Sequence, residues 1–148
     1  MATLLGSHLP EELMSRLGEN RRAMAGTAVP ICTIDLEGFP HPAMLSYEEL
    51  AADSPSAIRA AIYGASTTAH NLRQRQLLTL LFVDERLTCY VKARVSGADV
   101  AHPSAAGVAV FPCAVEAVLI DRVDTTREPA AAIATGITFS RAVSGTTL

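Results

Sequence analysis

The feature that most limits the possible folds is a regular alternation of apolar and polar residues between positions 87 and 100. The apolar row is Leu87, Cys89, Val91, Ala93 and Val95, and the polar row is Thr88, Tyr90, Lys92, Arg94 and Ser96. A period of two places one row of side chains in a core and the other row outside. This segment is therefore predicted to be a long strand with one buried face.

Other segments also have the character of β-strands, and turn residues separate them. The pattern predicts strands at residues 28–35, 41–46, 57–63, 77–83 and 108–121, with a short strand at 136–139. Gly38 lies in the turn between the first two, where it relieves the backbone strain of a hairpin reversal. Pro112 predicts an edge, a bulge or a division in the last long strand, because proline cannot donate to a sheet. Residues 47–56 are predicted to be a connecting loop with room for one helical turn.

Two short helices are predicted beside these strands. The first spans Pro10 to about Asn20, because proline suits the first helical position, two glutamates follow it, and leucines recur at helical spacing. The second directly follows the strand at 57–63, where Ser66 or Thr67 is placed to cap it. Six mostly antiparallel strands with two short helices predict a mainly β fold, a small closed or partly split barrel.

Length and composition indicate one domain over residues 1–148. The chain has 148 residues, of which 49% are hydrophobic, so it can bury one core but is too short for two ordinary domains. We expect an N-terminal helix at about 10–20, a barrel at about 28–121 and a C-terminal segment at 122–148. Charged residues make up 18% and the net charge is −3, which argues against disorder and against nucleic acid as a partner.

The sequence also argues against membrane insertion and against a metal site. No apolar run approaches the roughly 20 residues of a membrane helix, and there is no signal-peptide pattern, so we expect a soluble, cytoplasmic protein without a membrane partner. Cys32, Cys89 and Cys113 form no Cys-x-x-Cys pair and are interpreted as buried thiols on strands. The four histidines are scattered and have no metal-ligand spacing.

The start of the second helix has the chemistry of an anion site. Backbone N–H groups at a helix start have no partner within the helix, and beside the hydroxyls of Ser66, Thr67 and Thr68 they would attract a phosphate. The alternative is that these hydroxyls only cap the helix. The residues alone leave both interpretations open.

The same region resembles a known family. The residues Ser66, Thr67, Thr68, Ala69, His70, Asn71 and Leu72 are similar to the Ser-Arg-Lys-Ala-x-Asn/Gln-Leu segment of pyridoxamine 5'-phosphate oxidase-like proteins, the FMN-binding split barrels. Residues 34–41 resemble the first turn of that family, and residues 90–97 resemble its long strand that ends in glycine. The motifs occur in the family's order and cover roughly residues 10–121.

The resemblance implies a six-stranded antiparallel split barrel of Greek-key type that forms a homodimer, with FMN in a groove at the subunit interface. Carried over by position, Ala61, Ile62 and Tyr63 would lie along the flavin, and Ser66, Thr67 and Thr68 would meet its phosphate. Asn71 occupies the family's Asn/Gln position, and Lys92 and Arg94 would lie near the cofactor. Alternatively, Tyr63 is a packing residue, and Lys92 and Arg94 pair with neighbours on adjacent strands.

One departure from the family concerns the phosphate. Thr67 and Thr68 replace the family's Arg and Lys, which removes two cations from the anion site. A charge-assisted contact is worth about 1.5–3 kcal/mol, so its loss would weaken binding by about tenfold or more. Arg59, Lys92 or Arg94 could substitute for the lost cations.

The resemblance implies an FMN-dependent oxidoreductase or reductase that acts on a small molecule. No counterpart of the segment with which true pyridoxamine phosphate oxidases bind their substrate is recognisable, so we expect a different substrate. Two alternatives stay open. One is a non-catalytic split barrel that has lost FMN and serves as a binding protein, and the other is a member that binds haem or a deazaflavin.

Overall fold

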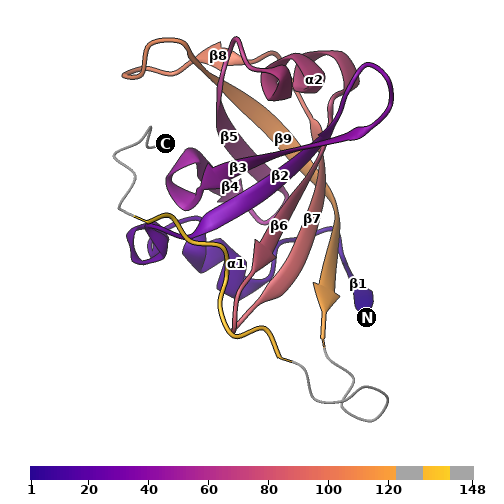
Figure 1. The fold of residues 1–148 in the computed structure, drawn as a ribbon, viewed down its shortest axis with the longest axis vertical. Coiled ribbons are helices and arrows are strands. Elements are labelled where there is room, and N and C mark those ends of the chain that lie inside the picture. Colours follow the sequence, from indigo (N-terminus) through magenta and orange to yellow (C-terminus); the bar gives the residue numbers. More distant parts are fainter. Residues whose placement is uncertain (123–131, 141–148) are drawn as a thin grey trace.

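Nine antiparallel strands form one curled sheet in the computed structural model, which describes residues 1–122 and 132–140 (Figure 1). The strands are β1 (Ala2–Gly6), β2 (Ala28–Ile34), β3 (Pro40–Ser46), β4 (Leu50–Ser54), β5 (Ala57–Tyr63), β6 (Leu77–Val83), β7 (Thr88–Val95), β8 (Val100–Ala101) and β9 (Val108–Asp121). The α-helices are α1 (Glu11–Arg16) and α2 (Thr67–Arg75), and η1 (Arg21–Met24) and η2 (Tyr47–Glu49) are short 3-10 helices. No helix within the described ranges is long and apolar enough to cross a membrane.

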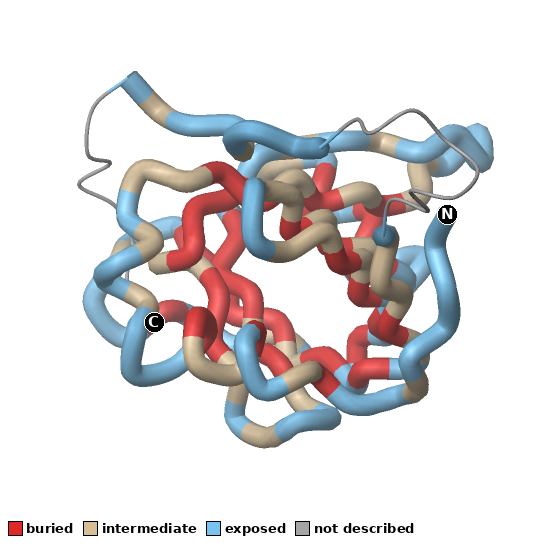
Figure 2. The backbone as a smooth tube through the Cα atoms, turned by 90° about the horizontal axis from the view of Figure 1, so that it is seen from below, coloured by how far each residue is buried: buried red, intermediate tan, exposed pale blue. Residues whose placement is uncertain are grey.

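The strands follow the order β3-β2-β6-β7-β9-β5-β4, and β1 and β8 pair with further parts of β9. The first six strands of this order are the six that the sequence predicts. The sheet curls so that its buried residues face inward and form a ring in the end-on view of Figure 2. The predicted mainly β split barrel is therefore confirmed.

Alternation along β7 determines which side chains form the core. Cys89, Val91 and Ala93 are buried inside the barrel, whereas Lys92 and Arg94 on the opposite face are exposed. Burial raises the pKa of Cys89 to about 11 and that of Cys113 on β9 to about 12. Both thiols are free, as is the half-buried Cys32 on β2, as the sequence predicts.

Pro112 neither ends nor divides β9, contrary to one of the sequence predictions. The Pro112 carbonyl accepts a hydrogen bond from the N–H of Ser96 at 2.9 Å, just beyond the end of β7. In an antiparallel strand the nitrogen and oxygen of one residue point to the same edge. The proline nitrogen therefore faces the gap between β7 and β8, where no ladder bond is lost.

Four other boundaries differ from the predictions. The first helix ends at Arg16 instead of about Asn20, because Gly18 follows and glycine is a poor helix former. The predicted loop at 47–56 contains η2 and β4, and the alternating segment at 87–100 divides into β7 and β8. Residues 136–139 contribute one bridge, Thr27 to Thr138, instead of a strand. Of the predicted C-terminal segment, residues 123–131 and 141–148 lie outside the described residues.

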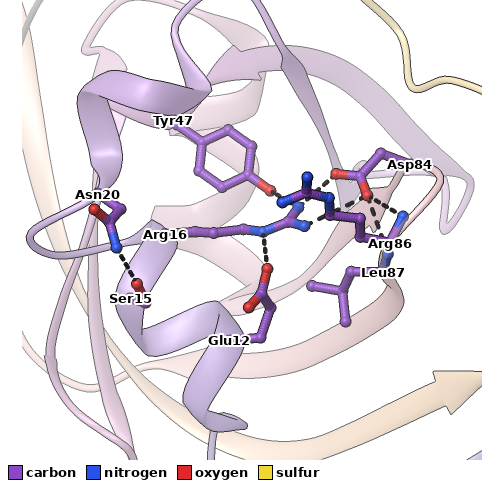
Figure 3. A network of polar contacts seen from close by, with 8 residues as sticks. All are labelled: Glu12, Ser15, Arg16, Asn20, Tyr47, Asp84, Arg86 and Leu87. Atoms are coloured by element: carbon purple, nitrogen blue, oxygen red, sulfur yellow. Dashed lines mark hydrogen bonds and ion pairs between the residues drawn. The ribbon is translucent and has the colours of Figure 1, made fainter.

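A buried guanidinium ties α1 to the barrel (Figure 3). The Arg16 side chain is only 6% exposed, and it donates to Glu12 at 3.1 Å, to the hydroxyl of Tyr47 at 3.4 Å and to Asp84 in a short ion pair. Asp84 also accepts the N–H groups of Arg86 and Leu87, which shape the turn between β6 and β7. Burial by itself would raise the pKa of Asp84, but Arg16 and the two N–H donors offset it and hold that pKa below its usual value.

We predict that Asp84→Asn lowers the free energy of unfolding by about 3 kcal/mol at neutral pH, because the buried Arg16 loses the more buried of its two carboxylate partners and keeps only the exposed Glu12. The folded-state pKa of Asp84 is lowered, so its stabilising contribution is complete above the unfolded pKa of about 4 and is lost as pH falls through the folded value. Denaturant unfolding between neutral and acid pH measures both effects. In the matched control Asp53→Asn, which removes an exposed partner of Arg59, we expect a change within about 0.5 kcal/mol.

Candidate functional site

The turn from β5 into α2 presents the features expected of an anion site. Ser66 is the N-cap of α2: its Oγ accepts the N–H of Ala69 at 3.1 Å and donates to the carbonyl of Tyr63 at 2.6 Å. The predicted cap is therefore confirmed. Within the described part of the chain, the N–H groups of Thr67 and Thr68 have no acceptor. These two amides lie in the first turn of the helix, where its dipole favours negative charge.

The strand that leads into this turn offers a free edge. β4 pairs with β5 only as far as Ala60, opposite Leu50, so residues 61–63 have no strand partner on that edge among the described residues. Ala61 and Ile62 are 3% and 5% exposed, whereas Tyr63 is 70% exposed at the end of the strand. Of these three residues, only Tyr63 is therefore accessible to a flat ligand in the single chain. The predicted contacts of these three residues with a cofactor stay predictions.

Asn71 lies on the inward side of α2. Asn71 is only 1% exposed, and its side-chain amide donates to the hydroxyl of Thr33 on β2 at 3.1 Å. This bond connects the helix to the opposite side of the barrel. Its predicted contact with a cofactor is untested, and the geometry favours a structural role.

Lys92 and Arg94 lie on the outer face of β7, and Lys92 is separated from the start of α2 by most of the length of β9. Lys92 is opposite Ala117 of β9, whereas Tyr63 is opposite Val108 of the same strand. These partners are nine positions apart on β9, roughly 30 Å at about 3.3 Å per residue. A single chain therefore does not bring Lys92 to the helix start. Arg94 donates to Glu116 at 2.7 Å, which is the cross-strand pairing that the sequence left open.

Arg59, which the sequence offers as another substitute for the family's two missing cations, also pairs with a residue on a neighbouring strand. Its Nε donates to both carboxylate oxygens of Asp53 on β4, at 3.0 and 2.9 Å. The pair is largely exposed on both sides. Arg59 is thus a solvated partner of Asp53 in this structure.

Arg73 is a cation near the turn that the sequence interpretation did not assign to the site. Its Nη1 donates to the carbonyl of Gly64 at 2.6 Å, two residues before the N-cap, and its guanidinium carbon lies 5.6 Å from the centre of the Phe111 ring. It also pairs with Asp99 at 3.0 Å, which raises the pKa of Arg73 and lowers that of Asp99. The sequence did contain a signal for this position. Arg73 follows Ser66 by seven residues, which is about two turns of an α-helix, so the two residues lie on the same face of α2.

One row of residues across the outer face of the sheet is largely apolar. Leu81, Tyr90, Leu119 and Leu4 lie opposite one another across β6, β7, β9 and β1, and Met44 lies opposite Pro30 across β3 and β2. Met44 is 52% exposed and Leu4 is 66% exposed. An antiparallel sheet usually carries polar residues on a solvated face. We call these six residues the outer apolar band.

Two hollows lie at the end of the barrel that carries α1, away from α2. One of about 520 Å³ is lined by α1, by the turn at 84–86 and by residues 134–138, and the other of about 560 Å³ adjoins Leu5, Pro10 and Arg122. None of the predicted cofactor residues lines either hollow. The first has three carboxylates against two guanidinium groups, which disfavours a phosphate there.

Comparison with known proteins identifies the fold. No protein-family model matches the chain, and no curated protein matches it. Among solved structures, it is similar to a proposed pyridoxamine 5'-phosphate oxidase from Lactobacillus delbrueckii, with a TM-score of 0.59 and 17% identity over 80% of this chain and 98% of that one. It is also similar to an FMN-binding protein from Syntrophomonas wolfei, with a TM-score of 0.56 and 16% identity over 76% and 88%. A third is the flavin reductase of styrene monooxygenase from Pseudomonas putida, with a TM-score of 0.55 and 12% identity over 70% and 86%.

These neighbours define the class of fold, a split β-barrel shared by pyridoxamine 5'-phosphate oxidase-like FMN-binding proteins and flavin reductases. The resemblance predicted from the turn and strand motifs is confirmed at this level. Because the identities are all below 20%, the likeness concerns the fold.

We predict that Asn71→Ala lowers the free energy of unfolding by about 2 kcal/mol, because it removes a buried hydrogen bond and leaves the hydroxyl of Thr33 with one partner fewer. Chemical denaturation measures the loss. Gln74→Ala, at an exposed position of the same helix, is the control and should change stability by less than about 0.5 kcal/mol. Unchanged stability in Asn71→Ala would contradict the structural role.

Proposed function

We propose that this protein binds FMN and acts as a flavin-dependent oxidoreductase of the reductase type, on a small-molecule substrate other than pyridoxamine phosphate. The observation that carries the proposal is the pair of N–H groups without an acceptor among the described residues, those of the exposed Thr67 and the buried Thr68, at the point where β5 of a split barrel enters α2. The donor set fits a phosphate, since two backbone N–H groups and nearby hydroxyls converge on a helix start. The structural neighbours include an FMN-binding protein and a flavin reductase, which supports a flavin as the ligand.

In this proposal each part of the turn has a separate task. The Thr67 and Thr68 amides hold the phosphate, and the end of β5 at the exposed Tyr63 orients the ring system. Bound FMN supplies the electron transfer, so the protein needs few acid–base side chains of its own. No group of His, Cys, Asp or Glu suited to a metal ion occurs among the described residues.

The proposal includes a homodimer with the cofactor at its interface. One chain holds Lys92 far from the helix start, so Lys92 could serve the site only from a second copy. The outer apolar band provides a surface for that copy, because burying Met44, Leu4 and their neighbours would remove exposed apolar area from water. Within a single chain, Arg73 is the cation beside the turn and would offset part of the charge lost at positions 67 and 68.

The absorption spectrum of the purified protein tests the ligand class. Flavin bands that are released on denaturation, or FMN uptake by a colourless preparation, are expected. A protein that is colourless and takes up no FMN would instead favour the non-catalytic binding protein. A haem spectrum or a deazaflavin spectrum would favour the other alternative.

We predict that Thr67→Arg strengthens FMN binding by about tenfold, because it restores a cation at an exposed position in the first turn of α2. Fluorescence titration of FMN measures the affinity. The control Gln74→Arg adds the same charge at another exposed position of the helix and should leave the affinity nearly unchanged. Equal effects of the two variants would show that the start of α2 is not the phosphate site.

We predict that Met44→Asp dissociates the dimer and lowers FMN uptake by about tenfold or more, because it places a charge in the apolar band. Sedimentation velocity gives the oligomeric state, and titration gives the uptake. Glu37→Gln in the exposed turn between β2 and β3 is the control and should leave both unchanged. A monomer that binds FMN as tightly as the wild type would refute the interface proposal while leaving the α2 site intact.

A further inference from the structure

The hollow of about 560 Å³ lies where four separate segments of the chain meet. Its lining residues come from β1, from α1 and the proline before it, from the connection between β6 and β7, and from the end of β9. In Figure 1 these segments lie together at the lower end of the barrel, beside the N-terminus. The hollow is open to solvent, so a small solute reaches it without any movement of the chain.

Both carboxylates that line this hollow already have a positively charged partner. Glu12 accepts from the Nε of Arg16 at 3.1 Å, and Asp121 pairs with the N-terminal ammonium of Met1 at 2.9 Å. Asp84, the second carboxylate that pairs with Arg16, lines the neighbouring hollow of about 520 Å³ instead. Much of the negative charge at the hollow of about 560 Å³ is therefore offset within the chain.

Two guanidinium groups line the same hollow without such a partner. The bond from Arg86 to Asp84 is made by its backbone N–H, and Arg122 takes part in a bond to Met1 only through its carbonyl. In the part of the chain that the structure describes, neither guanidinium has a hydrogen bond or an ion pair. The carboxylate of Glu85 lines the neighbouring hollow. Because guanidinium donors match carboxylate and phosphate oxygens, the hollow offers two unused donor groups to an oxyanion.

Apolar side chains form much of the remaining lining. Leu87 and Ile120 are half-buried and pack against the core of the barrel, so their positions are fixed by the fold. Leu5 is 54% exposed and adds apolar surface that water still covers. Small-molecule sites commonly have volumes of about 300–1,000 Å³ and combine apolar walls with a few polar groups. This hollow has both features, and covering Leu5 and Ile120 would favour binding.

We propose that this hollow binds a small organic anion, whose oxygens pair with Arg86 and Arg122 and whose compact apolar body lies against Leu5, Leu87 and Ile120. The charged group is a carboxylate or a phosphate ester, since both present oxygens that a guanidinium binds in pairs. None of the residues proposed for the flavin lines this hollow, so the inference does not rest on the proposed function.

An NMR titration of the full chain with phenyl phosphate and with benzoate tests the site. The amide resonances of Thr88 and Ile120 report the hollow, and those of Thr67 and Thr68 report the start of α2. We expect saturable shifts of Thr88 and Ile120, and the probe that binds more tightly identifies the anionic group. Inorganic phosphate lacks the apolar body and benzyl alcohol lacks the charge, so each should bind about tenfold or more weakly than the better probe. Probes that shift only Thr67 and Thr68, or no amide, would overturn the proposal.

The variants Arg86→Gln and Arg122→Gln test the two donors. Each should weaken binding of the better probe by about fivefold or more, because one contact between a guanidinium and the anion is lost at an exposed position. Arg22→Gln removes the same charge from an exposed position outside the hollow and should leave the affinity unchanged. All three side chains are exposed, so we expect the variants to fold, which chemical denaturation verifies. Unchanged affinity in both Arg86→Gln and Arg122→Gln, or an equal loss in Arg22→Gln, would overturn the proposal.

Discussion

The continuity of β9 is the constraint on which the rest of the structure depends. This strand of 14 residues pairs with β5 and β8 along its first half and with β7 and β1 along its second half, so four strands take their register from one backbone. The register with β7 shifts between Lys92 and Ala93, where the partners on β9 are Ala117 and Val115, and the register with β1 shifts between Leu4 and Gly6. A bulge of this kind increases the local twist and bends the strand, which helps a flat sheet to close into a barrel.

The pairing along β9 also explains why the candidate site residues do not come together within one chain. The start of α2 lies at the Val108 end of β9, and Lys92 lies near its middle, so the length of the strand separates groups that the family resemblance would combine. Flexible side chains cannot bridge such a distance within one chain. A second copy on the outer apolar band would remove the conflict, and the band itself has no other evident purpose in a barrel whose core is already filled. The separation of the basic residues and the apolar outer face therefore support the same proposed assembly.

The parts of the fold that the sequence predicts are those set by local patterns. β5, β6 and β9 have the predicted bounds, and Ser66 caps α2, because alternation, turn residues and capping act within a few neighbouring positions. β1 and β4 were missed, because β1 exists only through pairing with the distant β9 and β4 has no clear alternation of apolar and polar residues. Arg73 was missed for the same reason as β1. Its role follows from Gly64, Asp99 and Phe111, which only the fold brings to its side chain.

The pairing of Arg73 with Asp99 bears on how a site that lacks the family's two cations could still hold a phosphate. The two side chains are 38% and 26% exposed, and an ion pair in such surroundings contributes less than about 1 kcal/mol. A phosphate at the Thr67 and Thr68 amides would carry more charge than one carboxylate, and it would add the field of the helix start. Arg73 could therefore turn from Asp99 to the ligand at small cost while its bond to Gly64 keeps it beside the turn. The charge absent at positions 67 and 68 is then replaced from the same helix, two turns later.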